Sequence, residues 1–146
     1  MNKACPVVLR RVDSTIELLA FQHPIAGKQI VKGTIEPGEN IESACERELI
    51  EESGLKIKSD FYLGSWNSGY KNQVWGFCKM QMTETVPDQW IYHTDDGGGL
   101  EFMFFWQSLD TKLSREWHPL FVGAIDYIKA ALTKKCSGPA KAGSLI

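Results

Sequence analysis

The sequence has few of the features that mark zinc, disulfide or membrane proteins. Its 4 cysteines are scattered without a CxxC pair or Cys/His spacing, which argues against a zinc site and a disulfide framework. No stretch approaches the ~20 apolar residues that span a bilayer. The opening segment MNKACPVVLRR has too short an apolar run for a secretory signal. We therefore expect a soluble, cytoplasmic protein that makes no membrane contact.

An excess of positive charge is also absent. With 16 basic and 18 acidic residues, the formal net charge is −2, so the chain offers no broad cationic surface for duplex nucleic acid. A polyanionic ligand would need local neutralisation, for example by a metal ion. The length of 146 residues suits one domain. We expect it over residues 1–136, followed over 137–146 by a flexible tail rich in Gly, Ala and Ser.

Segments typical of strands alternate with two segments typical of helices. The strand segments are rich in β-branched, aromatic and leucine side chains. They are residues 5–12, 16–21, 55–66, 73–82 and 100–109. A helix capped by Asn40 should end at Gly54, and a second helix should begin at Ser114. This order predicts an α/β layered domain with a mixed β-sheet between helices.

The first predicted helix carries an unusual density of glutamates. Glu48, Glu51 and Glu52 stand at i, i+3 and i+4, so their carboxylates share one face within an arc of ~100°. Like charges at this spacing repel, and a cation would remove the repulsion. Because oxygen ligands favour hard ions, the cluster predicts Mg²⁺, with Mn²⁺ as the alternative, bound together with substrate phosphate oxygens. A merely solvated acidic face is the competing interpretation of the glutamates alone.

The residues around the glutamates form a more specific pattern. Gly33 is followed after five residues by Glu39, and after seven more by the run RELIEESGL from Arg47 to Leu55. This pattern resembles the Nudix box at every defined position. The resemblance covers residues 33–55, and the strands before and after the box, with a late helix, are similar to the Nudix fold as well. It implies a Nudix-type α/β/α sandwich with a mixed β-sheet.

The resemblance also implies roles for individual residues. The implied metal-site residues are Gly33, through its backbone, and Glu48, Glu51 and Glu52. The implied catalytic residues are Glu39, Arg47, Glu48 and Glu52. In this set Arg47 pairs with Glu39, because a guanidinium can orient a carboxylate by bidentate hydrogen bonding.

For function, the resemblance implies a metal-dependent pyrophosphohydrolase that cleaves a diphosphate linkage in a nucleoside diphosphate derivative. A nucleoside triphosphate or a dinucleoside polyphosphate would be such a substrate. The metal would neutralise charge at phosphorus while a carboxylate takes the proton of the attacking water. Glu52 is our first choice for this base, with Glu48 and a later acidic residue as alternatives. The sequence lacks the proline of the ADP-ribose type and the longer NADH-type motif, so the substrate stays open.

Two residues outside the box are further candidates. Tyr70 lies in a polar loop, sixteen residues past Gly54, and loosely resembles the tyrosine of dinucleoside polyphosphate hydrolases. We expect it to contact substrate. Glu101 follows the glycines at 97–99 and opens a predicted strand, a place from which a loop can deliver a carboxylate to the metal-phosphate centre. The competing interpretation puts Glu101 on the solvent side of an alternating strand, with Asp95 and Asp96 as other donors.

Two alternatives accompany this assignment. A non-catalytic nucleotide-binding domain of the same type is one, although the intact carboxylate set argues against it. An isomerase on the same fold would need a longer chain and a reactive cysteine, for which only Cys45 and Cys78 are candidates. The expected partner is a nucleotide or another small molecule with a diphosphate, and a homodimer is one option for the oligomeric state.

Overall fold

The computed structural model describes residues 1–95 and 98–136, so the predicted tail at 137–146 lies outside the described residues. The described residues form nine strands and two helices. In chain order they are β1 (Lys3–Val7), β2 (Leu9–Val12), β3 (Thr15–His23), β4 (Gly27–Gln29), β5 (Gly33–Thr34), α1 (Ile41–Ser53), β6 (Ser59–Asn67), β7 (Val74–Met80), β8 (Trp90–His93), β9 (Glu101–Ser108) and α2 (Pro119–Cys136).

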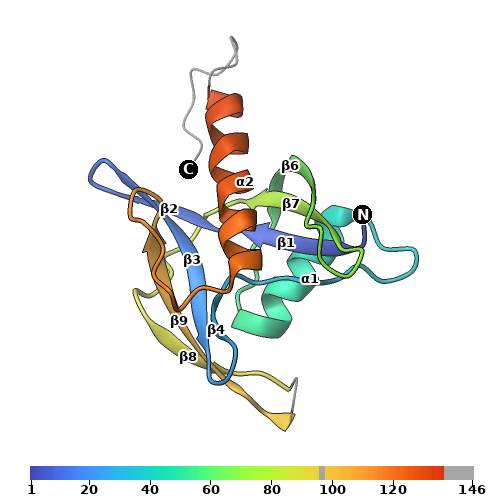
Figure 1. Ribbon diagram of the computed structural model, residues 1–146. Coiled ribbons are helices and arrows are strands. Elements are labelled where there is room, and N and C mark those ends of the chain that lie inside the picture. Colours follow the sequence, from blue (N-terminus) through green and yellow to red (C-terminus); the bar gives the residue numbers. More distant parts are fainter. Residues whose placement is uncertain (96–97, 137–146) are drawn as a thin grey trace.

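The described strands are arranged in two sheets, which lie on either side of α2 in Figure 1. The first sheet has the order β5-β1-β7-β6 and is mixed, because β1 runs parallel to β7 and antiparallel to β5. The second sheet has the order β2-β3-β9-β8, with β4 paired to β3, and is antiparallel throughout. The mixed sheet that the sequence predicts is therefore accompanied by a second, antiparallel one.

The segment predicted as one strand over residues 5–12 is shared between the two sheets. It divides at Val8, whose carbonyl accepts a hydrogen bond of 2.9 Å from the Leu19 amide. Before Val8 the chain pairs with β7, and after it with β3. The apolar run from Val7 to Leu9 carries no signal for such a change of partner, because it is buried on both sides of the division.

The two faces of the sheets are covered by different helices. Along β1 and β3, Cys5 and Leu18 pack with α2 in one hydrophobic cluster. The neighbouring residues Ala4 and Leu19 pack with α1 in the other. Since successive strand residues point to opposite faces, both faces are apolar and each needs a helix. This arrangement confirms the predicted α/β/α sandwich.

Helix α1 matches its prediction at both ends. The Asn40 side chain accepts a 2.8 Å hydrogen bond from the Ser43 amide, and Gly54 ends the helix in the left-handed conformation at φ 80°. Its amide donates to the Ile50 carbonyl. A Cβ at position 54 would also lie 2.7 Å from the Tyr92 ring, so two constraints require this glycine. The cap and the stop fix the turn that carries the glutamates.

The start predicted for the second helix is wrong. The chain forms a turn after Ser114, whose carbonyl accepts from the Trp117 amide, and α2 begins only at Pro119. Proline suits the first helical position because its fixed φ is already helical and it has no amide to satisfy. The His118 Nδ1 accepts from the Leu120 amide at 3.1 Å and so caps the helix in place of a serine.

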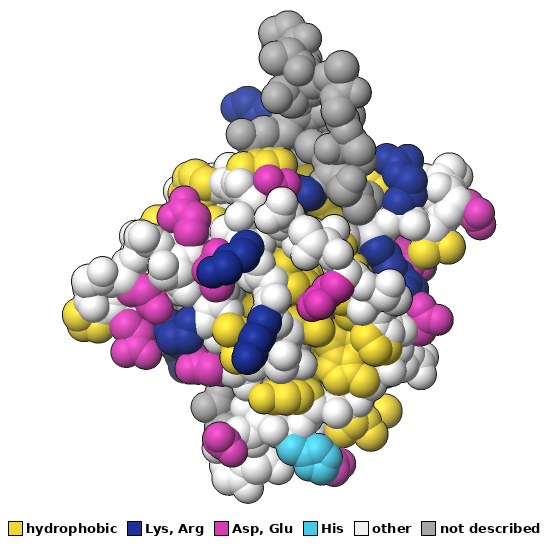
Figure 2. All heavy atoms as spheres, turned by 180° about the vertical axis from the view of Figure 1, so that it is seen from behind, with side chains coloured by type: hydrophobic (Ala, Val, Ile, Leu, Met, Phe, Trp, Pro, Cys, Tyr) yellow, Lys and Arg dark blue, Asp and Glu magenta, His cyan; other side chains and the backbone are white. Residues whose placement is uncertain are grey.

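The positions of the charged residues and of the cysteines agree with what the composition predicts. Figure 2 shows basic and acidic side chains interspersed around an apolar area, on the face turned away in Figure 1. Within residues 1–95 and 98–136, no helix is long and apolar enough to cross a membrane. Cys45 and Cys78 are free thiols with no exposed surface, so a substrate on the surface could not reach either sulfur.

Candidate active site

Gly33 and Glu48 are in direct contact where β5 meets α1. Strand β5 pairs with β1 through Gly33 and Ala4, and α1 packs on both strands. A Cβ atom at position 33 would overlap the carboxyl group of Glu48, well inside the 3.0 Å that real Cβ atoms keep from other atoms. The missing side chain of Gly33 therefore makes room for this carboxylate, which is only 8% exposed.

Arg47 gathers the carboxylates of the predicted site. Its Nε and Nη2 donate to the two oxygens of Glu39 at 2.7 and 2.9 Å, and Nη2 also donates to the Thr34 carbonyl at 2.9 Å. Its Nη1 donates to Glu48 and to Glu51, at 2.8 Å in each case. A planar guanidinium with five donors in a fixed fork suits this role. The structure thus brings three predicted glutamates together around the Arg47 cation.

The same contacts keep Glu39 ionised. The hydrogen bonds from Arg47, and after them the bond from the Glu36 amide, lower the pKa of Glu39 from 4.5 to about 2. The hydrogen bond to Glu39 also raises the pKa of Arg47. Both groups are therefore charged at neutral pH, and the pair fixes the segment before α1 to the helix.

Lys32 lies over two aromatic rings, and the charges of two glutamates act on it. Its ammonium is 5.1 Å from the Trp75 ring centroid and 5.7 Å from that of Phe121. Burial, followed by the charge of Lys3, lowers the pKa of Lys32, while the charges of Glu52 and Glu48 raise it. Lys32 is therefore within electrostatic reach of both glutamates. Sequence reasoning missed it, although it directly precedes Gly33.

The chemistry of the donors fits a hard divalent cation. Glu48, Glu51 and Glu52 offer carboxylate oxygens, and Gly33, whose carbonyl is a further oxygen donor, lies against the Glu48 carboxyl group. As these side chains stand, no three His, Cys, Asp or Glu residues of the described ranges converge on one point that could hold a metal ion. Arg47 Nη1 bridges Glu48 and Glu51 instead. Metal binding would require these two carboxylates to turn from Nη1, while Glu39 still holds Nε and Nη2.

Tyr70 lines a cavity of about 200 Å³ next to Lys32. The other lining residues come from β4, from the segment before it and from the start of α2, and they include Gln29, His118 and Phe121. The Tyr70 and His118 rings meet edge to face, with centroids 6.5 Å apart. No sequence signal links residues 29, 70 and 118, which lie on three separate segments. The structure places the predicted Tyr70 in one lining with Lys32.

The structure does not bring Glu101 to the carboxylates of α1. Its Oε2 lies 3.3 Å from Nε2 of His93, on the neighbouring strand β8, and its side chain is 59% exposed. The next residue, Phe102, is buried in the cluster that contains α1. Successive strand residues face opposite ways, so Glu101 points to the other face of β9. Asp96 lies outside the described residues. A role for Glu101 at the metal stays a prediction.

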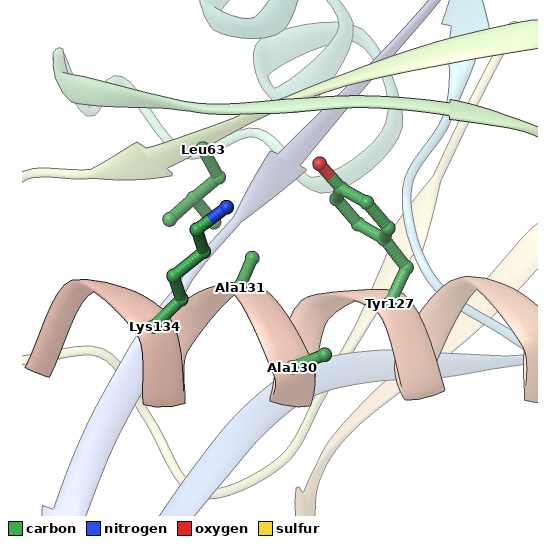
Figure 3. Close-up of a pocket in the computed structure, with 5 residues that line it drawn as sticks. All are labelled: Leu63, Tyr127, Ala130, Ala131 and Lys134. Carbon is green, nitrogen blue, oxygen red and sulfur yellow. The ribbon is translucent and has the colours of Figure 1, made fainter. Parts of the chain in front are cut away.

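A groove of about 470 Å³ lies between β6 and α2 and is lined by Leu63, Tyr127, Ala130, Ala131 and Lys134. In Figure 3 the Tyr127 hydroxyl and the Lys134 amino group both extend from α2 toward β6. None of the lining residues is a predicted site residue, and α2 covers the sheet faces opposite α1. This groove therefore does not belong to the candidate active site.

The fold is an α/β/α sandwich in which Arg47 binds glutamates of α1 next to Gly33 of β5. These features define a class of phosphate-handling proteins rather than a single activity. Comparison with family models is more specific. The model described as NUDIX domain matches residues 3–119. The chain therefore belongs to the Nudix family of hydrolases, which confirms the resemblance seen in residues 33–55.

Curated relatives share part of the chain. It is 34% identical over 82 residues to a protein named NAD-capped RNA hydrolase NudC from Klebsiella pneumoniae (strain 342), which covers 56% of this chain and 29% of the relative. For the protein of the same name from Citrobacter koseri, the identity is 35% over 77 residues, covering 53% and 27%. The match thus spans less than a third of the length of these relatives.

Solved structures agree with the fold over most of the chain. An ADP-ribose pyrophosphatase from Streptococcus suis superposes with a TM-score of 0.61 at 14% identity, covering 92% of this chain and 91% of that one. A Caenorhabditis elegans Ap4A hydrolase complex gives 0.62 at 18%, covering 90% and 98%. A MutT protein from Methanosarcina mazei gives 0.63 at 16%, covering 91% and 93%. At these identities the likeness concerns the fold alone.

Proposed function

We propose that this chain hydrolyses a phosphoanhydride bond in a nucleoside diphosphate derivative and that it needs Mg²⁺ or Mn²⁺ to do so. The observation that carries the proposal is the contact of Glu48 with Gly33, held by Arg47. Carboxylates confined in this way favour a hard cation that also binds phosphate oxygens. Family membership and the Ap4A hydrolase and NudC names of similar proteins support the same class of substrate.

The metal would be held by Glu48, Glu51 and Glu52 together with the Gly33 carbonyl. When bound, the ion would neutralise charge on the diphosphate and lower the pKa of a coordinated water. Arg47 would keep its two bonds to Glu39 and so hold α1 in register with the preceding segment. The protein's part is to fix the oxygens before substrate arrives, because a preorganised site avoids reorganisation during the reaction.

Proton transfer would fall to a glutamate of the same helix. Glu52 is the first choice, and its charge, like that of Glu48, acts on Lys32, which lines the cavity. Glu48 is the alternative. The Lys32 ammonium would bind diphosphate oxygens between the carboxylates and the cavity, and Tyr70 would contact the group attached to that diphosphate. A general base near the attacking water contributes ~10² to 10⁴-fold to a hydrolysis rate.

The test is hydrolysis of a substrate panel with Mg²⁺ and with Mn²⁺. The panel contains nucleoside triphosphates, ADP-ribose, dinucleoside polyphosphates, NADH, coenzyme A, nucleotide sugars and NAD-capped RNA. We expect Glu51→Gln and Glu52→Gln to abolish most turnover of any accepted substrate while circular dichroism stays unchanged, because each substitution removes an anionic oxygen but keeps the volume.

Glu42→Gln is the matched control, since Glu42 lies on the same helix in its exposed first turn and away from Arg47. It should hydrolyse at the wild-type rate. Near-normal metal-dependent turnover by both Glu51→Gln and Glu52→Gln would contradict the mechanism. Binding of nucleotides with no turnover of any panel member would favour the non-catalytic alternative.

A further inference from the structure

One face of strand β8 and of the residue after it contacts the end of the helix that carries the candidate metal ligands. We propose that Trp90 and Thr94, both on this face, are positioning residues for Glu51 and Glu52, which they hold in place through the main chain of α1. The inference rests on the proposed function, because it concerns the carboxylates that would bind the metal.

The last turn of α1 ends in carbonyl groups that the helix itself does not satisfy. The Gly54 amide donates to the Ile50 carbonyl at 2.9 Å. The next amide, that of Leu55, donates to the Ser53 hydroxyl at 3.1 Å and so leaves the regular helical pattern. The carbonyls of Glu51 and Ser53 take their donors from another part of the chain.

Both of these donors come from side chains of the β8 segment. Trp90 Nε1 donates to the Ser53 carbonyl at 3.2 Å, and the Thr94 hydroxyl donates to the Glu51 carbonyl at 3.4 Å. Residues 90, 92 and 94 point the same way because side chains alternate along a strand. The residues between them, 91 and 93, are exposed. The inward face of this segment is therefore the one that binds the end of α1.

This face is itself held in place by further contacts. The Trp90 ring stacks on Phe104 of β9, with centroids 4.8 Å apart and planes inclined by 8°. The Tyr92 ring lies so close to Gly54 that a Cβ there would be 2.7 Å from it. Thr94 is 2% exposed, and its amide donates across the hairpin at 3.0 Å. The two donors are thus fixed before any ligand binds.

The charges of the last turn make such outside support important. Glu51 and Glu52 stand at the end of α1 where the helix dipole is negative, and no basic residue lies in that turn. The dipole and the repulsion between neighbouring carboxylates both oppose a close arrangement of negative groups. Donors placed at the terminal carbonyls offset part of this negative potential, so the two bonds from β8 stabilise the turn.

The main-chain bonds matter most when a metal binds. The Glu51 carboxylate is held by Arg47 Nη1 at 2.8 Å, a bond that must break before this carboxylate can reach a cation. The bond from Thr94 goes to the Glu51 carbonyl and does not involve the carboxylate. It can therefore persist while the side chain turns. In the metal-bound state the position of Glu51 would then depend on the backbone that Thr94 and Trp90 fix.

Calorimetric titration of the intact protein with Mn²⁺, without substrate, tests the assignment. Thr94→Val removes the hydroxyl and keeps the branched shape, and Trp90→Phe removes the indole N–H and keeps an aromatic ring at this position. We expect each substitution to raise the Kd for Mn²⁺ about tenfold, as loss of an outer supporting group does at metal sites. Thr94→Ser should restore the wild-type Kd, because serine keeps the hydroxyl. Bonds that only stabilise the fold would lower Tm and leave this Kd unchanged.

Thr133→Val is the matched control. The Thr133 hydroxyl also donates to a helix carbonyl, that of Lys129 at 3.0 Å, but it does so in α2. This variant should bind Mn²⁺ with the wild-type Kd. Wild-type Mn²⁺ affinity in both Thr94→Val and Trp90→Phe overturns the positioning role and leaves the metal site standing. Failure of the intact protein to bind Mn²⁺ overturns the metal site of the proposed function, and the positioning role with it.

Discussion

Replacing Gly33 by alanine is the sharpest perturbation of the candidate site. The new Cβ would fall within 3.0 Å of all three atoms of the Glu48 carboxyl group, which must then move by about 1 Å or more. The backbone of Gly33 does not have positive φ, so the substitution acts through this overlap and not through backbone strain. A misplacement of about 1 Å at a reacting centre can cost ~10²-fold in rate.

We expect Gly33→Ala to lower kcat roughly 100-fold for any accepted substrate and to weaken Mn²⁺ binding in calorimetry. Overpacking of a buried contact costs ~1 to 3 kcal/mol of unfolding free energy. At ~2 to 4 °C per kcal/mol for a domain of this size, differential scanning calorimetry should show a modest fall in Tm. We thus expect a large fall in kcat beside only a modest fall in Tm.

Gly76→Ala is the control for this experiment. Its Cβ would also meet close neighbours, the Met1 sulfur and, at 2.8 Å, the end of the Ile41 side chain, but both are flexible and remote from Glu48. It should lower Tm to a similar extent and leave Mn²⁺ affinity unchanged. Wild-type kcat and Mn²⁺ affinity in Gly33→Ala would refute the inference that the glycine exists to accommodate Glu48.

Three further outcomes are expected. The pKa of Glu39 is lowered in the folded state, so its contribution to stability is present above pH 4.5 and lost as pH falls toward about 2. Glu39→Gln should therefore flatten the plot of unfolding free energy, measured in urea, against pH across this window. The same slope as in the wild type would contradict this expectation. Gly54→Ala should lower the free energy of unfolding, measured in urea, by ~1 to 2 kcal/mol, because alanine disfavours the left-handed conformation and its Cβ would meet Tyr92. An unchanged free energy of unfolding would show that this position does not require glycine. We propose residues 1–136 as the folding unit, so deleting 137–146 should leave Tm and kcat unchanged, and a lower Tm would show that Leu145 and Ile146 dock on the domain.

The parts of the fold that could be predicted are those governed by local chemistry. Asn40 and Gly54 bound α1 because a cap and a left-handed stop act within one turn of helix. Ser114 misled the prediction because a serine also forms ordinary turns, and Pro119 gave the better signal for a first helical position. Strand β8 was missed because its four residues are defined mainly by their pairing with β9.

The candidate site likewise has one part that local chemistry predicts and one part that depends on tertiary structure. Glu48, Glu51 and Glu52 could be placed on one face because helical spacing is regular. The cavity around Tyr70 could not be predicted, since it is built where a hairpin turn, a short strand and a helix cap meet. Lys32 belongs partly to each of these two cases. Its position next to Gly33 is visible in the sequence, but its contact with the Trp75 ring depends on the pairing of β1 with β7.

The strand that divides at Val8 limits where the chain can gain or lose residues. The alternation of faces continues through the division, since Val7 and Leu9 pack with α2 whereas Val8 packs with α1. One inserted residue at this point would invert every later side chain of β2, turning Leu9 outward and Arg10 into the core. A duplication or deletion here would thus be eliminated by selection, whereas the exposed turn at 13–14 could change in length. Homologues with insertions should carry them in that turn and keep the spacing from β1 to β2 constant.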